Sequence, residues 1–267
     1  MPGKHVLNTH NFSPGVQTKV TVIGCGGTGS ALVSGLPYLH QALRAKGHRG
    51  LKVTLIDGDL ISETNCVRQP FTRAEIGLYK SMVLASRLNL FWNLDWDFIA
   101  GYVDEKSDHL KGDIVISCVD RRSARKAIHD QVSDASNQVR YWLDLGNSAA
   151  AGQFILGQPL NMVNPRKANR LPTVGELFPE ILDPAEEEDD QPSCSTFEAL
   201  QKQQPFVNQV LANQALALLS RLLWIGEISY HGGFVNLETG QTTPMPIAPT
   251  YWKKVRRINR NKNNAQR

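Results

Sequence analysis

The stretch that decides the fold runs from Lys19 to Gly29 and reads Lys-Val-Thr-Val-Ile-Gly-Cys-Gly-Gly-Thr-Gly. Residues 19–23 form an apolar, β-branched run that predicts a buried strand. The next residues are a turn with glycines at Gly24, Gly26, Gly27 and Gly29. The apolar segment 30–45 then predicts a helix. Because glycines let the backbone approach phosphate oxygens and a helix N-terminus is positive, this order predicts a phosphate-binding turn at the start of a βαβ unit.

The first half of the chain continues the alternation of strands and helices. We expect strands at residues 51–56, 98–103, 113–118, 141–145 and 153–156, and helices at residues 80–91 and 123–132. The segment 51–56 predicts a second buried strand of the kind that a parallel sheet contains. These elements predict an α/β fold with a Rossmann-like, doubly wound sheet of mostly parallel strands and helices on both faces.

The second half of the chain differs in composition. Residues 164–193 are rich in proline, glycine and acidic residues and predict an acidic crossover loop. Apolar residues at helical spacing predict a long helix over 206–224, and residues 228–241 predict a β-hairpin. The basic stretch 253–267 is expected to be disordered or frayed by itself. We therefore expect a nucleotide-binding core at 1–163, the crossover loop at 164–193, a helix and hairpin completing the same domain at 194–252, and a basic tail at 253–267.

Bulk composition excludes few partners. The 267 residues carry 29 Lys and Arg against 25 Asp and Glu, a formal net charge of +4. This charge is too small to predict nucleic acid or a membrane as the main partner. No run of ~18 apolar residues predicts a membrane span, and the start of the sequence lacks the apolar core of a signal peptide. We therefore expect a cytoplasmic protein.

An acidic residue follows the second strand. Asp57 is placed to accept hydrogen bonds from ribose hydroxyls, as in dinucleotide-binding domains. Strand, glycines and acid together leave NAD, FAD, S-adenosylmethionine and ATP open as ligands.

An ordered series of motifs after this point distinguishes these ligands. It consists of Asp57, Asp59, Asn65, Arg68 and Gln69, then Gly77 with Lys80, then Cys118 with Asp120. The series resembles the D-x-D-x5-N-x-x-R-Q, G-x-x-K and C-x-D motifs of the ThiF/MoeB and ubiquitin-activating enzyme superfamily. Within that superfamily the overall pattern, with Pro192-Ser-Cys194-Ser and the final Gly-Gly-Phe-Val-Asn near Gly232, most resembles the ThiF-like component of bacterial PRTRC cassettes. The resemblance implies ATP-dependent adenylation of the C-terminal carboxylate of a ubiquitin-like, β-grasp protein that ends in glycine.

The resemblance also implies roles for single residues. ATP would be bound by the four glycines of the turn and by the side chains of Asp57, Asp59, Asn65, Arg68, Gln69, Lys80 and Asp120. Arg68 and Lys80 suit the neutralisation of charge on phosphate oxygens during adenylation. Asp120 would hold Mg²⁺, with Asp59 a weaker second candidate. Each has a simpler interpretation, since Asp120 would also serve as a helix N-cap and the two cations as surface charges.

Cys194 is the candidate nucleophile for a second step. The sequence from Ser195 to Glu198 fits a capping box, which would place Cys194 before a helix N-terminus that favours thiolate. The acidic run at 186–190 opposes this effect, and a structural cysteine is the competing interpretation. Some ThiF/MoeB relatives stop at the acyl adenylate, whereas ubiquitin-activating relatives pass the acyl group to a cysteine thiolate. By resemblance to the latter we expect a thioester at Cys194, with a conjugating enzyme, a sulfur carrier and a lysine open as the final acceptor.

The chain departs from its superfamily in two respects. It has no C-x-x-C pair, so we expect no zinc. Residues 1–19 contain no arginine, whereas family homodimers send an N-terminal arginine into the partner's ATP site. A homodimer is expected by resemblance, with no residue assigned to that arginine's role.

Two alternative functions remain open at this stage. One is an NAD-dependent oxidoreductase that uses the same turn and Asp57. Arg68, Lys80 and Asp120 count against it, since NAD binding needs none of them. The other is a non-catalytic nucleotide-binding adaptor that contacts DNA through the basic tail. A solvated terminus is the favoured interpretation of that tail.

Overall fold

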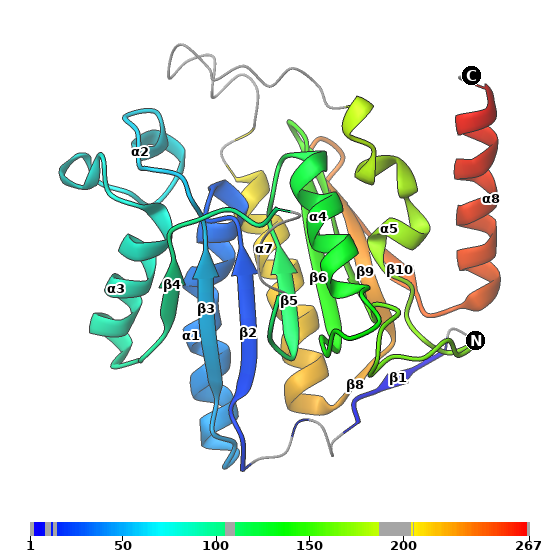
Figure 1. Ribbon diagram of the computed structural model, residues 1–267, viewed down its shortest axis with the longest axis horizontal. Coiled ribbons are helices and arrows are strands. Elements are labelled where there is room, and N and C mark those ends of the chain that lie inside the picture. The colour runs from blue at the N-terminus through cyan, green and yellow to red at the C-terminus, as the bar shows by residue number, and fades with distance from the viewer. Residues whose placement is uncertain are drawn as a thin grey trace.

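The described residues of the computed structural model are 3–8, 12, 15–104, 110–186, 204 and 206–265, with 260–265 as backbone only. A central eight-stranded sheet has the order β10-β9-β7-β6-β5-β2-β3-β4 (Figure 1). The strands are β2 (Thr18–Ile23), β3 (Leu51–Ile56), β4 (Asp97–Ile99), β5 (Ile114–Ser117), β6 (Tyr141–Asn147), β7 (Ala151–Gly157), β9 (Tyr230–Asn236) and β10 (Gln241–Pro246).

The sheet has a parallel part and an antiparallel part. β4, β3, β2, β5 and β6 pair in parallel, whereas β7, β9 and β10 extend the sheet antiparallel beyond β6. β2 lies between β3 and β5, so the chain leaves β2 toward one side of the sheet and later returns on the other. Such a switch point opens a crevice at the carboxyl ends of the strands, where α/β proteins bind ligands.

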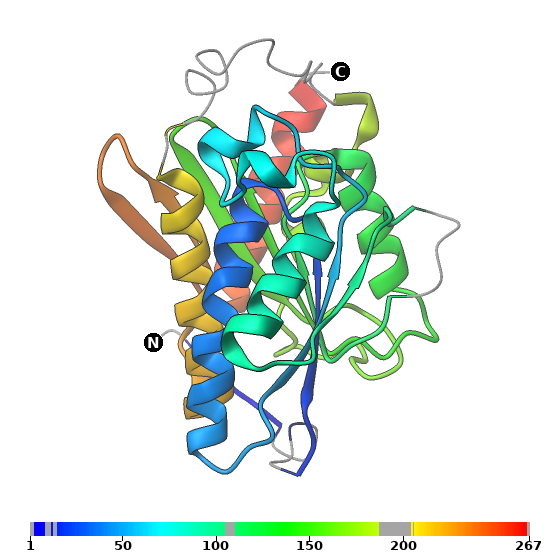
Figure 2. The same ribbon diagram turned by 90° about the vertical axis from the view of Figure 1, so that its left-hand side faces the viewer.

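Helices cover both faces of the sheet (Figures 1 and 2). Helices α1 (Gly27–Ala45), α3 (Lys80–Trp92) and α7 (Val207–Ser220) cover one face, with α1 and α7 packed side by side. Helix α4 (Arg122–Val132) covers the other face, together with the short α5 (Val174–Leu177). The predicted α/β architecture, with its mostly parallel central strands and helices on both faces, is confirmed.

The hydrophobic core joins the two halves of the chain. Val22, Leu55 and Ile116 from the parallel strands are fully buried, as are Leu211 and Leu218 from α7. Most residues of β2, β3 and β5 are buried, because helices cover the sheet from both sides. The helix predicted over 206–224 is therefore a core element, and its last turns continue as a π-helix, η5 (Arg221–Ile225).

Two segments differ from the sequence-based expectations. The strand expected at 98–103 ends at Ile99, and the following Gly101 and Tyr102 form a loop. The crossover loop contains α5 and the 3₁₀ turns η3 (Pro179–Leu182) and η4 (Pro184–Glu186). Short elements that the sequence did not predict are β1 (His5–Val6), β8 (Glu227–Ile228), α2 (Asn65–Arg68) and η2 (Arg73–Glu75).

The basic tail, expected to be disordered or frayed by itself, is helical over most of its length where it packs on the rest of the protein. Residues 249–265 form helix α8 (Pro249–Ala265) at one edge of the molecule (Figure 1). Trp252 Nε1 donates to His231 Nε2 at 3.0 Å, and Asn259 Nδ2 donates to the Leu177 carbonyl oxygen at 2.8 Å. These contacts to distant residues stabilise a helix that its own composition does not predict. Among the described helices, none is long and apolar enough to cross a membrane.

Candidate active site

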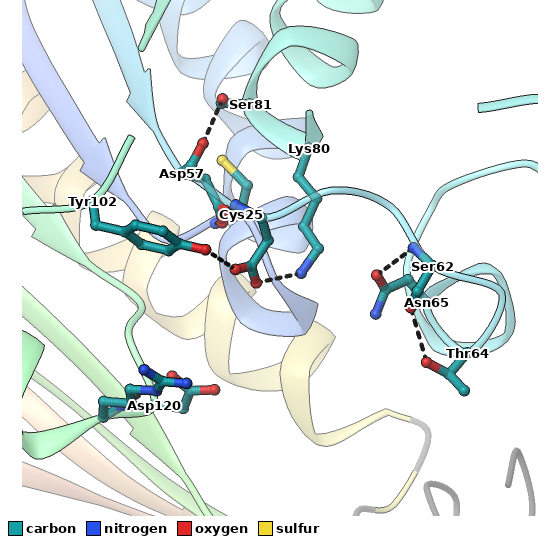
Figure 3. A network of polar contacts seen from close by, with 11 residues as sticks. Cys25, Asp57, Ser62, Thr64, Asn65, Lys80, Ser81, Tyr102 and Asp120 are labelled. Atoms are coloured by element: carbon teal, nitrogen blue, oxygen red, sulfur yellow. Dashed lines mark hydrogen bonds and ion pairs between the residues drawn. The ribbon is translucent and has the colours of Figure 1, made fainter. Parts of the chain in front are cut away.

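The carboxyl ends of β2, β3 and β5 bring most of the candidate residues to one edge of the sheet. The glycine-rich turn follows β2, Asp57 and Asp59 follow β3, and Asp120 follows β5. Lys80 reaches the same edge as the first residue of α3. Figure 3 shows Lys80 and Tyr102 pointing toward a shared carboxylate beside Cys25, with Asp120 on the neighbouring strand end.

The glycine-rich turn is shaped by close backbone contacts. Gly24 has φ +89°, and a Cβ there would lie 2.7 Å from the Cys118 carbonyl oxygen. A Cβ at Gly29 would lie 1.8 Å from the Gly24 carbonyl oxygen. Neither position accepts a side chain, because the neighbours are backbone atoms and Gly24 needs the left-handed region. Gly24 and Gly29 therefore build the turn itself.

Gly26 and Gly27 face different surroundings. Gly26 is the N-cap of α1, and no heavy atom lies within 4 Å of the position its Cβ would take. A Cβ at Gly27 would instead lie 2.3 Å from Nδ2 of Asn208 on α7. The N-cap offers no side-chain hydrogen bond, and the first turn of α1 holds no acidic residue. The N-terminus of α1 therefore suits an anion on the side where Gly26 leaves space, because the first N–H groups of a helix have no partner within the helix itself.

Asp57 holds the turn in place. Its Oδ2 accepts a hydrogen bond from the Cys25 N–H, and its Oδ1 accepts one from the Asp59 N–H at 2.7 Å. Burial raises the pKa of this carboxyl group, while the two backbone donors and Lys80 act in the opposite direction. Both oxygens thus bind the protein's own backbone, and each keeps a second lone pair for the ribose contact expected from the sequence.

Asp59, Lys80 and Tyr102 form one polar cluster. Lys80 Nζ lies 2.8 Å from Asp59 Oδ2, and the Tyr102 hydroxyl donates to Asp59 Oδ1 at 2.8 Å. The Lys80 side chain is only 7% exposed. Burial by itself would raise the pKa of Asp59, but the hydrogen bonds from Lys80 and Tyr102 hold it below its usual value. The hydrogen bond between Tyr102 and Asp59 raises the pKa of Tyr102 to about 12. The ammonium group of Lys80 is therefore held in one place at the edge of the site.

The short helix α2 carries the predicted residues Asn65 and Arg68, and the predicted Gln69 is its C-cap. Asn65 is buried, and its Oδ1 accepts a hydrogen bond from the Ser62 N–H at 3.0 Å, so it shapes the loop before α2. Arg68 Nε and Gln69 Oε1 are buried without a hydrogen-bond partner in the part of the chain that the structure describes. Unpaired buried polar atoms are costly, and a ligand that bonds to them removes that cost.

Asp120 is exposed in the loop between β5 and α4. Its Oδ1 accepts a hydrogen bond from the Arg121 N–H at 2.9 Å, and Arg121 is the N-cap of α4. The simpler interpretation of Asp120 as the N-cap is therefore wrong. Beneath this loop, Arg125 Nε donates to the fully buried Asp144 Oδ1 at 3.0 Å and its Nη2 donates to the Val119 carbonyl oxygen at 2.6 Å. This ion pair fixes the backbone next to Asp120.

Three cysteines lie at or near this edge of the sheet. Burial raises the pKa of the Cys25 thiol and that of the Cys118 thiol, so neither is a ready nucleophile. Cys66 is half-buried on α2. Cys194 and the capping-box residues 195–198 lie outside the described residues. Among the residues that the structure describes, there is no group of three or more His, Cys, Asp or Glu side chains that would hold a metal ion by itself.

Comparison with known proteins agrees with this geometry. The family model described as "ThiF family" matches residues 16–254. The chain belongs to the ThiF family. None of the curated proteins compared with it matches at a significant level.

Solved structures share the ThiF-family fold of this chain. Escherichia coli MccB with ATP is 16% identical with a TM-score of 0.57, over 90% of this chain and 66% of that one. E. coli MccB with AMPCPP and MccA is 17% identical with a TM-score of 0.56, over 86% and 64%. PaaA is 15% identical with a TM-score of 0.56, also over 86% and 64%. The chain thus spans less than two thirds of the length of the structures it matches.

Several polar residues of this ThiF-family site were not singled out from the sequence. Tyr102 lies within the strand expected at 98–103 and belongs to none of the motifs. The Thr28 hydroxyl lies 2.8 Å from Asn208 Oδ1 and 3.0 Å from Asn147 Oδ1, which joins the start of α1 to α7 and to the end of β6. Thr28 stands inside the glycine-rich turn, so its position was a usable signal. Asn208 lies 180 residues further along the chain, and the sequence offers no signal for that contact.

Proposed function

We propose that this chain uses ATP to adenylate the C-terminal carboxylate of a small protein of the ubiquitin-like, β-grasp type. The observation that carries the proposal is the meeting of an uncapped helix N-terminus, a buried lysine and an exposed aspartate at the switch point of the sheet. Family membership and the likeness to a solved MccB structure that contains ATP support adenylation chemistry.

The residues present fit a nucleoside triphosphate. The N–H groups at the start of α1 suit phosphate oxygens, and Gly26 leaves the space that those oxygens need. Arg68 Nε has no partner within the described chain and would donate to a further phosphate oxygen. Asp57 is the proposed acceptor for ribose, while Asn65 and Gln69 complete the site from α2.

The donor set also fits Mg²⁺ held mainly by phosphates. Mg²⁺ keeps several waters and needs one or two protein carboxylates when it binds a nucleotide. Asp120 would supply one oxygen, and Asp59 is the second carboxylate at this edge. When bound, Mg²⁺ neutralises charge on the phosphate oxygens.

The chain's own residues would position the reactants and neutralise charge. Attack by a carboxylate on the α-phosphorus forms an acyl adenylate and expels pyrophosphate, and negative charge builds on the oxygens during that step. Lys80 is held by Asp59 and presents its ammonium group at the site, whereas Arg68 presents a guanidinium group from α2. Substituting Arg68→Ala should slow ATP–pyrophosphate exchange on the order of 10²-fold, and an unchanged rate in a folded variant would refute this role.

A second step at Cys194 is part of the proposal. The Cys194 thiolate would attack the acyl carbon of the adenylate, form a thioester and release AMP, before transfer to a conjugating enzyme. Gln204, which follows this segment, donates its N–H to the Ala149 carbonyl oxygen at 2.8 Å in the β6–β7 turn. The chain after Cys194 thus rejoins the described fold beside Asn147, which contacts the glycine-rich turn through Thr28.

Cys194→Ala tests this step directly. The variant should keep ATP–pyrophosphate exchange and lose any thiol-sensitive adduct with the partner protein. Cys66→Ala is the matched control and should keep both. A wild-type enzyme that exchanges pyrophosphate without forming an adduct, or an adduct that survives Cys194→Ala, would contradict the thioester proposal.

We also propose a homodimer, from the family resemblance. Sedimentation measures the oligomeric state and tests this proposal.

The NAD-dependent alternative makes a different prediction about ligands. ATP with Mg²⁺ at 100 times its dissociation constant should stabilise the fold by about 2.7 kcal/mol and raise the melting temperature by roughly 5–10 °C. NAD should leave the melting temperature unchanged. The reverse result would favour an oxidoreductase.

A further inference from the structure

Helix α8 carries a row of exposed cations on its outer face. Lys253, Lys254 and Arg257 are exposed, and none of them has an ion pair among the described residues. At 100° per residue these three positions share one side of the helix. The sequence of α8 contains no acidic residue, and its basic residues continue with Arg260 and Lys262.

The opposite side of α8 is fixed to the protein. Trp252 is buried against His231, with their rings 5.3 Å apart, and Asn259 is buried against the end of α5. Arg256 Nε donates to the Glu176 carbonyl oxygen at 3.1 Å. Because these contacts fix the rotation of the helix, Lys253, Lys254 and Arg257 form a constant outward stripe. We call these three residues the α8 stripe.

We propose that the α8 stripe binds the phosphate backbone of double-stranded DNA. A duplex carries one negative charge per about 1.7 Å of its axis, and an array of unpaired cations on a fixed helix releases counterions when it binds such a chain. The stripe spans about 6 Å of the helix axis, which is comparable with the spacing of neighbouring phosphates, so its three cations meet adjacent phosphates. In Figure 1, α8 stands at the outer edge of the molecule, beside α5 and away from α2 and α3. The surface is therefore separate from the proposed nucleotide site.

The chemistry of α8 favours duplex DNA over other anionic partners. Single-strand binders stack bases on exposed aromatic rings, whereas Tyr251 is half-buried and Trp252 is buried. A membrane-surface helix needs an outward apolar face, but the apolar side of α8 is packed on the protein and only Ile258, 43% exposed, faces out among its large apolar residues. The stripe offers charge without apolar contact, which is the pattern of phosphate recognition.

The test compares two variants of the full chain that change the charge equally. In the stripe variant, Lys253, Lys254 and Arg257 are each replaced by Gln. In the control, three exposed cations elsewhere are replaced by Gln, namely Arg44, Arg49 and Lys111. Binding to a labelled 30-base-pair duplex of arbitrary sequence is measured by fluorescence anisotropy between 50 and 200 mM NaCl.

We expect the stripe variant to bind on the order of 10-fold or more weakly than wild type at 50 mM NaCl. The slope of log affinity against log salt should fall by about 2.7, since each lost phosphate contact removes about 0.9. The control should bind like the wild type, and both variants should keep the ATP-induced rise in melting temperature. That last readout separates this inference from the proposed adenylation.

Four results would overturn the inference. The first is that the wild type does not bind the duplex at 50 mM NaCl, and the second is that the stripe and control variants lose binding equally. The third is that polyglutamate displaces the protein from labelled duplex as well as unlabelled duplex does at matched charge. The fourth is that the protein binds phosphatidylserine vesicles more tightly than the duplex. The third would assign the stripe to an acidic protein and the fourth to a membrane surface.

Discussion

Substitution of Gly26 separates the stability of the fold from binding of the nucleotide. Gly26 has φ −73° and ψ −150°, an extended conformation that any residue adopts, and its Cβ would meet no heavy atom within 4 Å. Gly26→Val should therefore fold, at a cost of at most about 1 kcal/mol for a poor N-cap residue. Gly26→Ser should be at least as stable as the wild type, because serine is a good N-cap.

Both substitutions should weaken ATP binding, because they fill the space through which phosphate approaches the N–H groups of α1. Loss of one charge-assisted hydrogen bond costs about 1.5–3 kcal/mol, which corresponds to about 10- to 150-fold in affinity. Valine should lie at the upper end or beyond, since its branched side chain blocks more than one N–H group. Serine should lie at the lower end.

Isothermal titration with ATP and Mg²⁺ measures the affinity, and urea unfolding measures the stability. Gly24→Ala is the matched contrast, because it meets the Cys118 carbonyl oxygen at 2.7 Å with φ +89° and should lose stability first. Unchanged ATP affinity in Gly26→Val, or affinity losses that follow the losses in stability across the three variants, would refute the assignment of this turn to phosphate.

Three further predictions concern groups that support the site or the fold. Arg125→Met leaves the fully buried Asp144 without its cation and should lower the free energy of unfolding in urea by about 3–5 kcal/mol. A loss below about 1 kcal/mol would contradict a structural role for the Arg125–Asp144 ion pair next to Asp120. Asp59→Asn removes the carboxylate that raises the pKa of Tyr102 to about 12, so an absorbance titration referenced to Tyr102→Phe should show that pKa returning toward ~10, whereas an unmoved pKa would argue against this hydrogen bond. Burial lowers the pKa of His231 to about 4, so the unfolded chain binds more protons between pH 6.5 and 4 and stability should fall as the pH is lowered through that window, by up to about 1.4 kcal/mol per pH unit for this residue. In His231→Gln the free energy of unfolding in urea should therefore differ less between pH 7 and pH 5 than in the wild type. An equal difference in the two proteins would show that His231 does not contribute to this pH dependence.

The extent to which the sequence predicts this molecule depends on how local each interaction is. The βαβ unit around Gly24 and Asp57 follows from adjacent apolar runs and glycines, and its elements lie where the sequence places them. The motifs also identify Asp59 and Lys80. Their mutual ion pair is not predictable from the motifs, because both residues are expected to face the nucleotide.

Long-range contacts set the limit of the sequence analysis. Helix α8 forms although its composition predicts a frayed tail, because Trp252 bonds to His231 and Asn259 bonds to Leu177, both far away in the sequence. The contact between Thr28 and Asn208 joins residues 180 positions apart. A pattern of apolar residues identifies α7 as a core helix but says nothing about which polar side chain on it reaches the glycine-rich turn.

ATP–pyrophosphate exchange reports reversible formation of an acyl adenylate, which is the reaction proposed for this site. We expect exchange that requires Mg²⁺ and a β-grasp protein with a free C-terminal glycine, and that is lost in a folded Asp120→Ala variant. Asp130→Ala is the matched control, since Asp130 lies on α4 in an exposed pair with Lys126, and it should exchange at the wild-type rate. Absence of exchange with every β-grasp partner tried, or wild-type exchange by Asp120→Ala, would contradict the account.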